Sequence, residues 1–346
     1  MARRSQVPAL ASIDRRVVPA LLGESMATTA EHVARGPTDG FRHEALLYAG
    51  DDGFLEGTLP WIRDAVAAGE PILVVVSAAR IARLRDELGA QAEGVTFADM
   101  ADVGTNPARI IPAWREFVDA HAGQGRRLRG IGEPIWAQRS PDELVECQRH
   151  EALLNLAFAG AEDFWLLCPY DVDALHPDVI VKAHRSHPTV VAGDETRRSD
   201  IYDDVDAVAA PFADPLSEPP RDADELPFGS GTLAAVRRLV QRRARDAGLS
   251  EVSTSDLMLA VNEVATNSIR HGGGAGVLRA WLTDDVLIFE VADAGAIVDP
   301  LAGRERPSSG QSGGHGLWLC NQVCDLVQLR TFAGGSVVRL HTRGDA

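Results

Sequence analysis

The sequence predicts two folded domains of different class: a three-layer α/β domain, followed by a two-layer α+β sandwich. The chain has 346 residues, 45% of them hydrophobic, which is more than one ordinary domain needs and enough for two cores. Predicted strands and helices alternate in the first half, whereas helices and hairpins follow one another in the second. We expect a poorly ordered leader at 1–40, domains at 41–193 and 232–346, and an acidic, Pro-rich linker at 194–231.

The first domain is predicted from alternating helix and strand patterns. Strands are expected at residues 43–50, 71–77, 94–100, 127–134 and 164–171. Helices are expected between them at residues 54–69, 79–90, 106–125 and 141–160. PILVVVS and FWLLCPYD are continuous apolar runs, typical of strands buried on both faces. Ser140, Pro141 and Glu143 predict a capping-box start for the last helix, and Gly69 an end for the first. This order predicts a parallel sheet between two helical layers.

The second domain is predicted from helices and hairpins. Helices are expected at residues 231–248, 256–272 and 314–325, the second of them capped by Ser253 or Ser255. Hairpins are expected at residues 275–295, turning at Asp284-Asp285, and at residues 326–342, turning at Gly334-Gly335. Antiparallel strands with helices on one face make an α+β sandwich.

Charge and cysteine content exclude several functions. The formal net charge is −16, and residues 194–225 alone contribute −8. Because no segment is strongly basic, direct nucleic-acid binding and adhesion to an anionic membrane are disfavoured. The four cysteines are sparse and lack CxxC spacing, and no apolar run is long enough to span a bilayer. We therefore expect a reduced, cytoplasmic protein.

One helical face carries a polar line of Glu263, Asn267 and His271, spaced at i, i+4 and i+8. Such a line is costly to bury without partners, so it faces water or lines a site. The Asn267 carboxamide oxygen suits a hard cation such as Mg²⁺. Glu263 suits the role of a general base.

Two later elements add to this line. Asp293 ends a predicted strand, and Gly295 two residues on lets a flat ring approach the backbone. The stretch Gly313–Leu317 opens a helix, whose free N–H groups suit phosphate. The stretch SSGQSGG before it can close as a lid. Each element alone is weak, since solvated faces and turns have the same patterns. Their order within one small domain is what favours a nucleotide site.

NEVATNSIRHG, VADAG and GGHGLWL resemble the N, G1 and G2 boxes of the GHKL (Bergerat-fold) ATP-binding superfamily, over nearly all of residues 232–343. Within it, the spacing is most similar to the anti-sigma-factor serine/threonine kinase branch. The resemblance implies ATP and Mg²⁺ as cofactors, Glu263 as catalytic base, Asn267 as Mg²⁺ ligand and Asp293 as adenine reader.

The same resemblance assigns the remaining nucleotide contacts. Gly295 would let the adenine ring approach the backbone next to Asp293. Ser336 stands where the family usually has a threonine beside the adenine, so a hydroxyl group is kept. Phosphate contacts would come from the start of the last helix, at Gly314, His315, Gly316 and Leu317. The lid of this family often carries a basic residue near the γ-phosphate, for which Arg304 or Arg306 are candidates. We expect His271 to pack at the rim without a catalytic role.

HEALLYAGDDGFL, GEPILVVVS, GEPIW, RHEALLN, CPYD and SHP resemble the MEDS sensory domain over about residues 41–190. That resemblance implies a RecA-like α/β core, and no phosphate loop of the G-x-x-x-x-G-K-[ST] type is present. We expect this domain to bind an unknown small ligand without hydrolysing ATP. Its polar candidates are His43, Glu133, His150, Glu151, Cys168, Tyr170, Asp171 and His187. The alternatives are satisfied structural groups, or a metal or haem site that includes Cys168.

Three functions remain open. The first is a regulator whose sensory domain controls a kinase domain that phosphorylates an anti-anti-sigma (STAS-type) protein or sequesters a sigma factor. The second is a non-catalytic switch that binds nucleotide or a partner. The third is a sensor histidine kinase acting on another chain, which is disfavoured because the helix at 232–247 contains no histidine. Relatives of the second domain often dimerise, so a homodimer is also possible.

Overall fold

In this computed structural model, residues 40–203, 215–307 and 314–344 are described. These described residues belong to one compact unit. The predicted leader lies outside the described residues apart from Gly40, and so do part of the predicted linker (204–214) and most of the predicted lid (308–313).

Among the described residues, seven strands form the first sheet, in the order β3-β2-β4-β5-β1-β6-β7. Their bounds are β1 (Phe41–Tyr48), β2 (Ile72–Val76), β3 (Thr96–Asp99), β4 (Leu128–Gly132), β5 (Phe164–Asp171), β6 (Thr189–Ala192) and β7 (Glu195–Arg198). All pair in parallel except β7, which is antiparallel to β6. The predicted parallel sheet is thus a mixed one. A two-residue turn at Gly193-Asp194, with Gly193 at φ 56°, reverses the chain.

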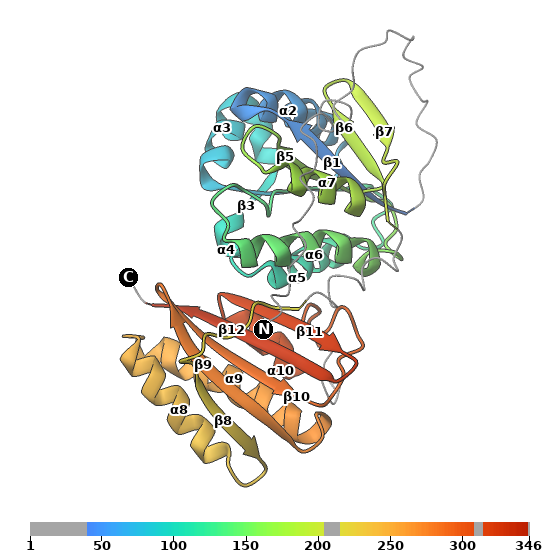
Figure 1. The fold of residues 1–346 in the computed structure, drawn as a ribbon. Coiled ribbons are helices and arrows are strands. Elements are labelled where there is room, and N and C mark those ends of the chain that lie inside the picture. Colours follow the sequence, from blue (N-terminus) through green and yellow to red (C-terminus); the bar gives the residue numbers. More distant parts are fainter. Residues whose placement is uncertain (1–39, 204–214, 308–313, 345–346) are drawn as a thin grey trace, which may run out of the picture. The chain divides into compact units, whose positions relative to one another are not determined.

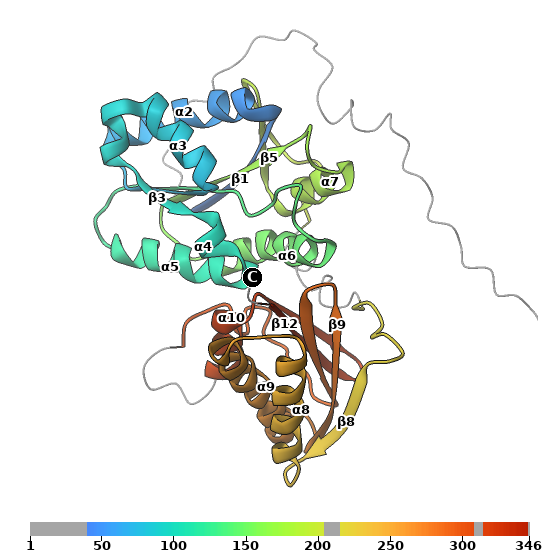
Figure 2. The same ribbon diagram turned by 90° about the vertical axis from the view of Figure 1, so that its left-hand side faces the viewer.

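Helices cover both faces of this sheet, as Figure 2 shows. Longer helices are α2 (Gly50–Ala68), α3 (Ala78–Leu88), α5 (Ile110–Ala120), α6 (Pro141–Ala157) and α7 (Pro177–Ser186), with η1 (Gly89–Gly94), α4 (Met100–Gly104) and η2 (Pro107–Arg109) as short segments. Alternate residues of β1 enter different cores, Leu46 with α2 and α3, and Ala45 with α5, α6 and α7. The predicted three-layer arrangement is therefore present.

Both predicted helix ends in this region are confirmed. The Glu143 N–H donates to Ser140 Oγ (3.3 Å) and the Ser140 N–H to Glu143 Oε2 (2.8 Å), which completes the capping box of α6. Gly69 ends α2 in the left-handed region at φ 65°. The helix α2 begins earlier than predicted, with Asp51 and Asp52 in its first turn, where carboxylates favour a helix N-terminus.

The second sheet of the described residues is antiparallel, in the order β11-β12-β10-β9-β8. Its strands are β8 (Asp224–Gly229), β9 (Ala275–Thr283), β10 (Val286–Asp293), β11 (Leu326–Phe332) and β12 (Gly335–Arg343). The helices α8 (Leu233–Asp246), α9 (Glu251–His271) and α10 (His315–Val323) lie on one face (Figure 1). Val261 and Val264 of α9 enter a core with Phe289 of β10. This is the predicted two-layer α+β class.

Three local predictions need correction. The strands β7 and β8 lie inside the range predicted as linker; β8 pairs with β9 and buries Phe228. The helix α9 is capped by Ser250, whose Oγ accepts from the Ser253 N–H (3.1 Å), because the helix starts two residues before Ser253. The second hairpin turns at residues 333–334, since Phe332 already pairs with Gly335.

Candidate functional site

The helix α9 presents Glu263 and Asn267 to the start of α10. Both side chains are half-buried, and they share one face because they are four residues apart. A Cβ added to Gly316 would lie 2.9 Å from Glu263 Oε2 and 3.1 Å from Asn267 Nδ2. The first turn of α10 therefore touches both polar groups, while His271 is exposed at the end of α9.

Asp293 and Ser336 meet at the end of the β10–β12 pair. Asp293 Oδ1 accepts hydrogen bonds from the Gly295 N–H (2.8 Å) and from Ser336 Oγ (2.9 Å). A Cβ at Gly295 would lie 2.8 Å from Gly272 Cα and 2.9 Å from His271 O. The chain after Asp293 is thus pressed against the end of α9, which only a glycine allows.

The start of α10 has the geometry of an anion site. Gly314 precedes the helix at φ 83°, and His315 is exposed. The N–H groups in the first turn of a helix lack intrahelical partners, and the helix dipole favours an anion there. These are the positions predicted to hold phosphate, except that the Leu317 side chain lines a different cavity. The predicted phosphate role of Arg304 is not supported, because its buried side chain donates to Glu146 (3.2 Å) instead.

We expect the Gly316→Ala substitution to weaken nucleotide binding by roughly 10-fold or more, since its methyl group must displace Glu263 or Asn267 from their positions. The matched control is Gly334→Ala, because a Cβ there meets no atom within 4 Å. Calorimetric titration with Mg-ATP measures both variants. Equal affinity of the two would contradict the assigned contact between α10 and α9.

A second polar site lies at the carboxyl ends of the parallel strands. A crevice there is lined by Tyr48, Arg80, Glu133, Trp136 and Asp171, among others. Tyr48 Oη donates to Glu133 Oε1 (2.6 Å), and Arg80 forms an ion pair with the same carboxylate. Burial raises the pKa of Glu133 to about 7, although Arg80 opposes this. Carboxyl-end crevices are where open α/β sheets bind ligands.

Of this crevice, the sequence analysis found Glu133 and Asp171 and missed Tyr48 and Arg80. The available signal was position, since Tyr48 ends β1 just as Asp171 ends β5.

The pKa of Glu133 predicts a pH-dependent stability. Its carboxyl group keeps a proton in the folded state that the unfolded state loses above about pH 4.5. The stability that this group contributes is therefore present below pH 4.5 and is lost as the pH rises to about 7. Relative to the Glu133→Gln variant, the wild-type free energy of unfolding should fall by up to about 3 kcal/mol over this window. Urea unfolding at pH 5 and pH 8 measures this, and a difference that does not change with pH contradicts it.

Four of the predicted sensory residues come together inside the first domain. His43 of β1, Glu151 of α6, Cys168 of β5 and His187 after α7 are at most 2% exposed, and we call them the buried His–Cys–Glu cluster. His43 Nε2 lies 3.1 Å from Glu151 Oε2 and 3.4 Å from Cys168 Sγ. His187 Nε2 lies 3.3 Å from the same carboxylate oxygen. Burial lowers the pKa of His43 to about 4, so its ring is neutral at neutral pH.

The other sensory candidates are placed around this cluster or away from it. The Tyr170 ring meets the His187 ring edge-on at 5.6 Å between centroids. His150 is also buried, and its Nδ1 has no hydrogen-bond partner among the residues that the structure describes. Glu133 lies in the crevice at the strand ends, outside the cluster.

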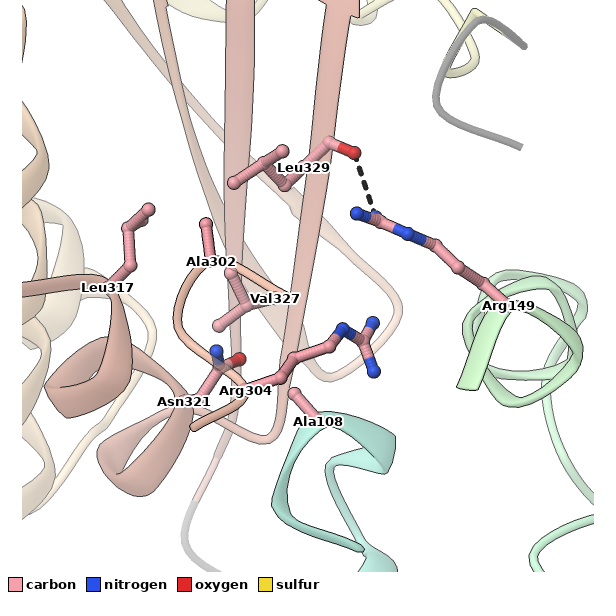
Figure 3. A pocket seen from close by; sticks show the side chains of 8 residues that line it. All are labelled: Ala108, Arg149, Ala302, Arg304, Leu317, Asn321, Val327 and Leu329. Atoms are coloured by element: carbon pink, nitrogen blue, oxygen red, sulfur yellow. Dashed lines mark hydrogen bonds between the residues drawn. The ribbon is translucent and has the colours of Figure 1, made fainter. Parts of the chain in front are cut away.

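A buried charge network surrounds Glu146 of α6, which the sequence analysis did not identify. Its carboxylate accepts from Arg330 (2.8 Å), Arg304 (3.2 Å) and Arg149 (3.4 Å), and its exposure is 0%. Figure 3 shows the adjoining cavity, where Arg149 donates to the Leu329 carbonyl (2.9 Å). Residues of α6 thus contact residues of the second sheet and of the segment before α10.

Two known families match separate parts of the chain. Residues 42–188 match the MEDS family, the methanogen/methylotroph, DcmR sensory domain. Residues 227–342 match the histidine kinase-like ATPase domain. The chain therefore combines a sensory domain with a histidine-kinase-like ATPase domain. More particularly, its N-terminal part is a MEDS domain and its C-terminal part is GHKL-like, as the sequence motifs predicted.

Solved structures with detectable similarity are distant. The RsbU and RsbW domains of Rv1364c from Mycobacterium tuberculosis match with 18% identity and a TM-score of 0.27, over 35% of this chain and 32% of theirs. The histidine kinase AdeS from Acinetobacter baumannii matches with 11% identity and a TM-score of 0.21, over 36% of this chain and 68% of its own. The chain thus spans about a third of the first structure. These scores are too low to define its activity.

Two further comparisons gave negative results. No curated protein matches the chain significantly. In the part of the chain that the structure describes, no helix combines the length and apolar character needed to cross a bilayer.

Proposed function

We propose that this protein is a signal-transduction regulator in which the MEDS domain controls a Bergerat-fold kinase domain. That domain would bind Mg-ATP and phosphorylate a serine or threonine of a STAS-type anti-anti-sigma protein, or sequester a sigma factor. The observation that carries the proposal is the contact of Gly316 with both Glu263 and Asn267. It brings a carboxylate, an amide and a helix N-terminus together, as phosphoryl transfer requires.

The residues present fit Mg-ATP. The Asn267 amide would ligate Mg²⁺, and the first N–H groups of α10 would hold phosphate. When bound, Mg²⁺ would neutralise phosphate charge. Asp293 is held by Gly295 and Ser336 through Oδ1, and its carboxylate would accept from the exocyclic amine of adenine.

Glu263 would act on the acceptor hydroxyl. As the hydroxyl oxygen bonds to the γ-phosphorus, the bond between that phosphorus and the β–γ bridging oxygen breaks and ADP leaves. The hydroxyl proton passes to the Glu263 carboxylate. A non-catalytic nucleotide switch would not need a carboxylate beside the Asn267 amide, so the presence of Glu263 favours the kinase.

The crevice of Tyr48, Arg80 and Glu133 is the proposed ligand site of the RecA-like sensory domain. It combines a cation, a phenol and a carboxyl group with a pKa of about 7. These groups suit a small polar molecule that exchanges hydrogen bonds with Glu133. A ligand bound there would contact Tyr48 at the end of β1 and Glu133 directly after β4, and could shift the backbone at both strand ends.

The helix α6 is the proposed connection between sensing and catalysis. Glu151 points into the buried His–Cys–Glu cluster, and Glu146 contacts Arg304 and Arg330. Five residues along a helix correspond to about 140° of rotation, so the two carboxylates leave α6 on different faces. A shift of α6 would therefore move Arg304, which lies in the segment leading to α10.

The test uses the purified full chain with ATP radiolabelled at the γ-phosphate, Mg²⁺ and candidate STAS-domain proteins. Acid-stable phosphoserine or phosphothreonine on the partner supports the proposal. ATP binding without transfer identifies a switch. Acid-labile, base-stable phosphate identifies a histidine kinase. Either of the last two results overturns serine/threonine transfer while leaving the nucleotide site in place.

A further inference from the structure

The hydrogen bonds around His187 determine which of its ring nitrogens carries the proton. Its Nδ1 lies 2.8 Å from the Ala183 carbonyl oxygen, which can only accept, so Nδ1 is the donor. The other ring nitrogen, Nε2, is then the atom that can offer a lone pair to a metal ion. Among the described residues it has no hydrogen-bond partner, although it is buried and Glu151 Oε2 lies 3.3 Å away. Two atoms that can each ligate a metal therefore lie side by side.

His43 is fixed in the same tautomer by a different partner. Asn155 Nδ2 donates to the Ser186 carbonyl (2.7 Å), which turns Asn155 Oδ1 toward His43. His43 Nδ1 lies 3.1 Å from this oxygen and must donate to it. His43 Nε2 consequently presents a second lone pair to Glu151 Oε2, at 3.1 Å.

A metal ion between these three groups would satisfy all of them at once. Both imidazole Nε2 atoms converge on one carboxylate oxygen, and Glu151 Oε1 is also buried without a hydrogen-bond partner in the part of the chain that the structure describes. The Cys168 thiol has one proton and can satisfy only one of them. Unsatisfied buried acceptors cost free energy, and a bound metal ion removes that cost.

We propose that the buried His–Cys–Glu cluster binds one zinc ion through two imidazole Nε2 atoms, the Cys168 thiolate and a Glu151 oxygen. One ligand atom from each of the four residues lies within 4.8 Å of the others. A tetrahedral zinc site has ligand separations of roughly 3.3–3.8 Å, so binding would draw the four side chains slightly closer together. Two nitrogens, a sulfur and an oxygen are a zinc donor set. Binding replaces the Cys168 S–H bond by an S–Zn bond and releases the proton.

The surroundings match those of protein metal sites. Metal-bound histidines usually donate their other N–H to a carbonyl or carboxylate, which orients the ring. Here Asn155 and the Ala183 carbonyl have that role. Because the ligands come from β1, β5, α6 and the end of α7, zinc would tie the sheet to the helix that carries Glu146. The site is independent of the proposed kinase activity.

The experiment measures metal binding by the full chain after treatment with a chelator. We expect one zinc per chain by elemental analysis. Titration with Co²⁺ should produce the near-ultraviolet thiolate-to-cobalt band and the intense visible bands of a tetrahedral site. Cys168→Ser should lose the thiolate band, whereas Cys147→Ser should keep it. Cys147 is the matched control, since it is equally buried but donates to the Pro134 carbonyl.

A second variant protects the test against misfolding. Asn155→Ala leaves all four proposed ligands in place and removes the group that orients His43, together with its hydrogen bond to the Ser186 carbonyl. It should weaken zinc binding by about 10- to 100-fold, as losses of such orienting groups do. Circular dichroism confirms that each variant is folded. The proposal is overturned if the folded wild type takes up no metal, if cobalt binds without the thiolate band, or if Asn155→Ala binds zinc as tightly as the wild type.

Discussion

The Asn267→Ala variant is expected to lose magnesium-dependent ATP binding. Removing a direct ligand should cost more than the roughly 10- to 100-fold typical of groups that only orient a ligand. Asn267 lies beside Gly316, where the phosphates are expected, so the variant removes the proposed Mg²⁺ ligand at that point. Calorimetry with and without Mg²⁺ measures the loss. The control is Gln241→Ala, which removes an exposed carboxamide from α8.

Glu263→Gln separates binding from transfer within the same site. The variant keeps the size and most hydrogen-bonding capacity of the side chain but cannot take a proton. Mg-ATP affinity should change by less than about 3-fold, while transfer to the partner should fall by roughly 100- to 10,000-fold. If Glu263→Gln transfers phosphate at the wild-type rate, Glu263 is not the base. If Asn267→Ala binds Mg-ATP with wild-type affinity, Asn267 is not a Mg²⁺ ligand.

Glu146→Ala is expected to produce the largest loss of stability. Its carboxylate is fully buried and forms ion pairs with Arg149, Arg304 and Arg330, so the variant removes a buried negative charge that three guanidinium groups share. Breaking a buried pair from one side costs about 3–5 kcal/mol. Urea unfolding of the full chain measures the change.

The matched control for Glu146 is Glu305→Ala. Glu305 also pairs with an arginine, Arg115, but the two side chains are 45% and 38% exposed. Exposed pairs contribute about 0–1 kcal/mol, so this variant should unfold nearly as the wild type does. If Glu146→Ala unfolds like Glu305→Ala, the network around Glu146 does not stabilise the protein.

Local patterns in the sequence predicted most of the secondary structure. The runs PILVVVS and FWLLCPYD form strands β2 and β5, and the Asp284-Asp285 turn joins β9 to β10. Such elements depend on contacts between residues close in sequence. The strands β6, β7 and β8 were missed because they are short, and β7 and β8 are largely polar. They form because neighbouring strands offer edges for pairing.

The candidate nucleotide site likewise has a part that local sequence spacing predicts and a part that only the fold determines. The i, i+4 spacing placed Glu263 and Asn267 on one face of α9, because helical geometry alone determines that relation. The sequence motifs also placed Asp293 and Ser336 in the same site by resemblance. Their hydrogen bond, however, depends on the register of β10 against β12, which only the folded sheet sets.

The sequence by itself determined the two fold classes, the family of each domain and the residue types available for chemistry. Only the tertiary structure decided which of these side chains contact one another. His43 and Glu151 are 108 residues apart, yet the packing of α6 on β1 brings them to 3.1 Å. Glu146 looks like any charged helical residue until Arg304 and Arg330 surround it. Periodicity is a local property, whereas the burial and pairing of a charge depend on what packs against it.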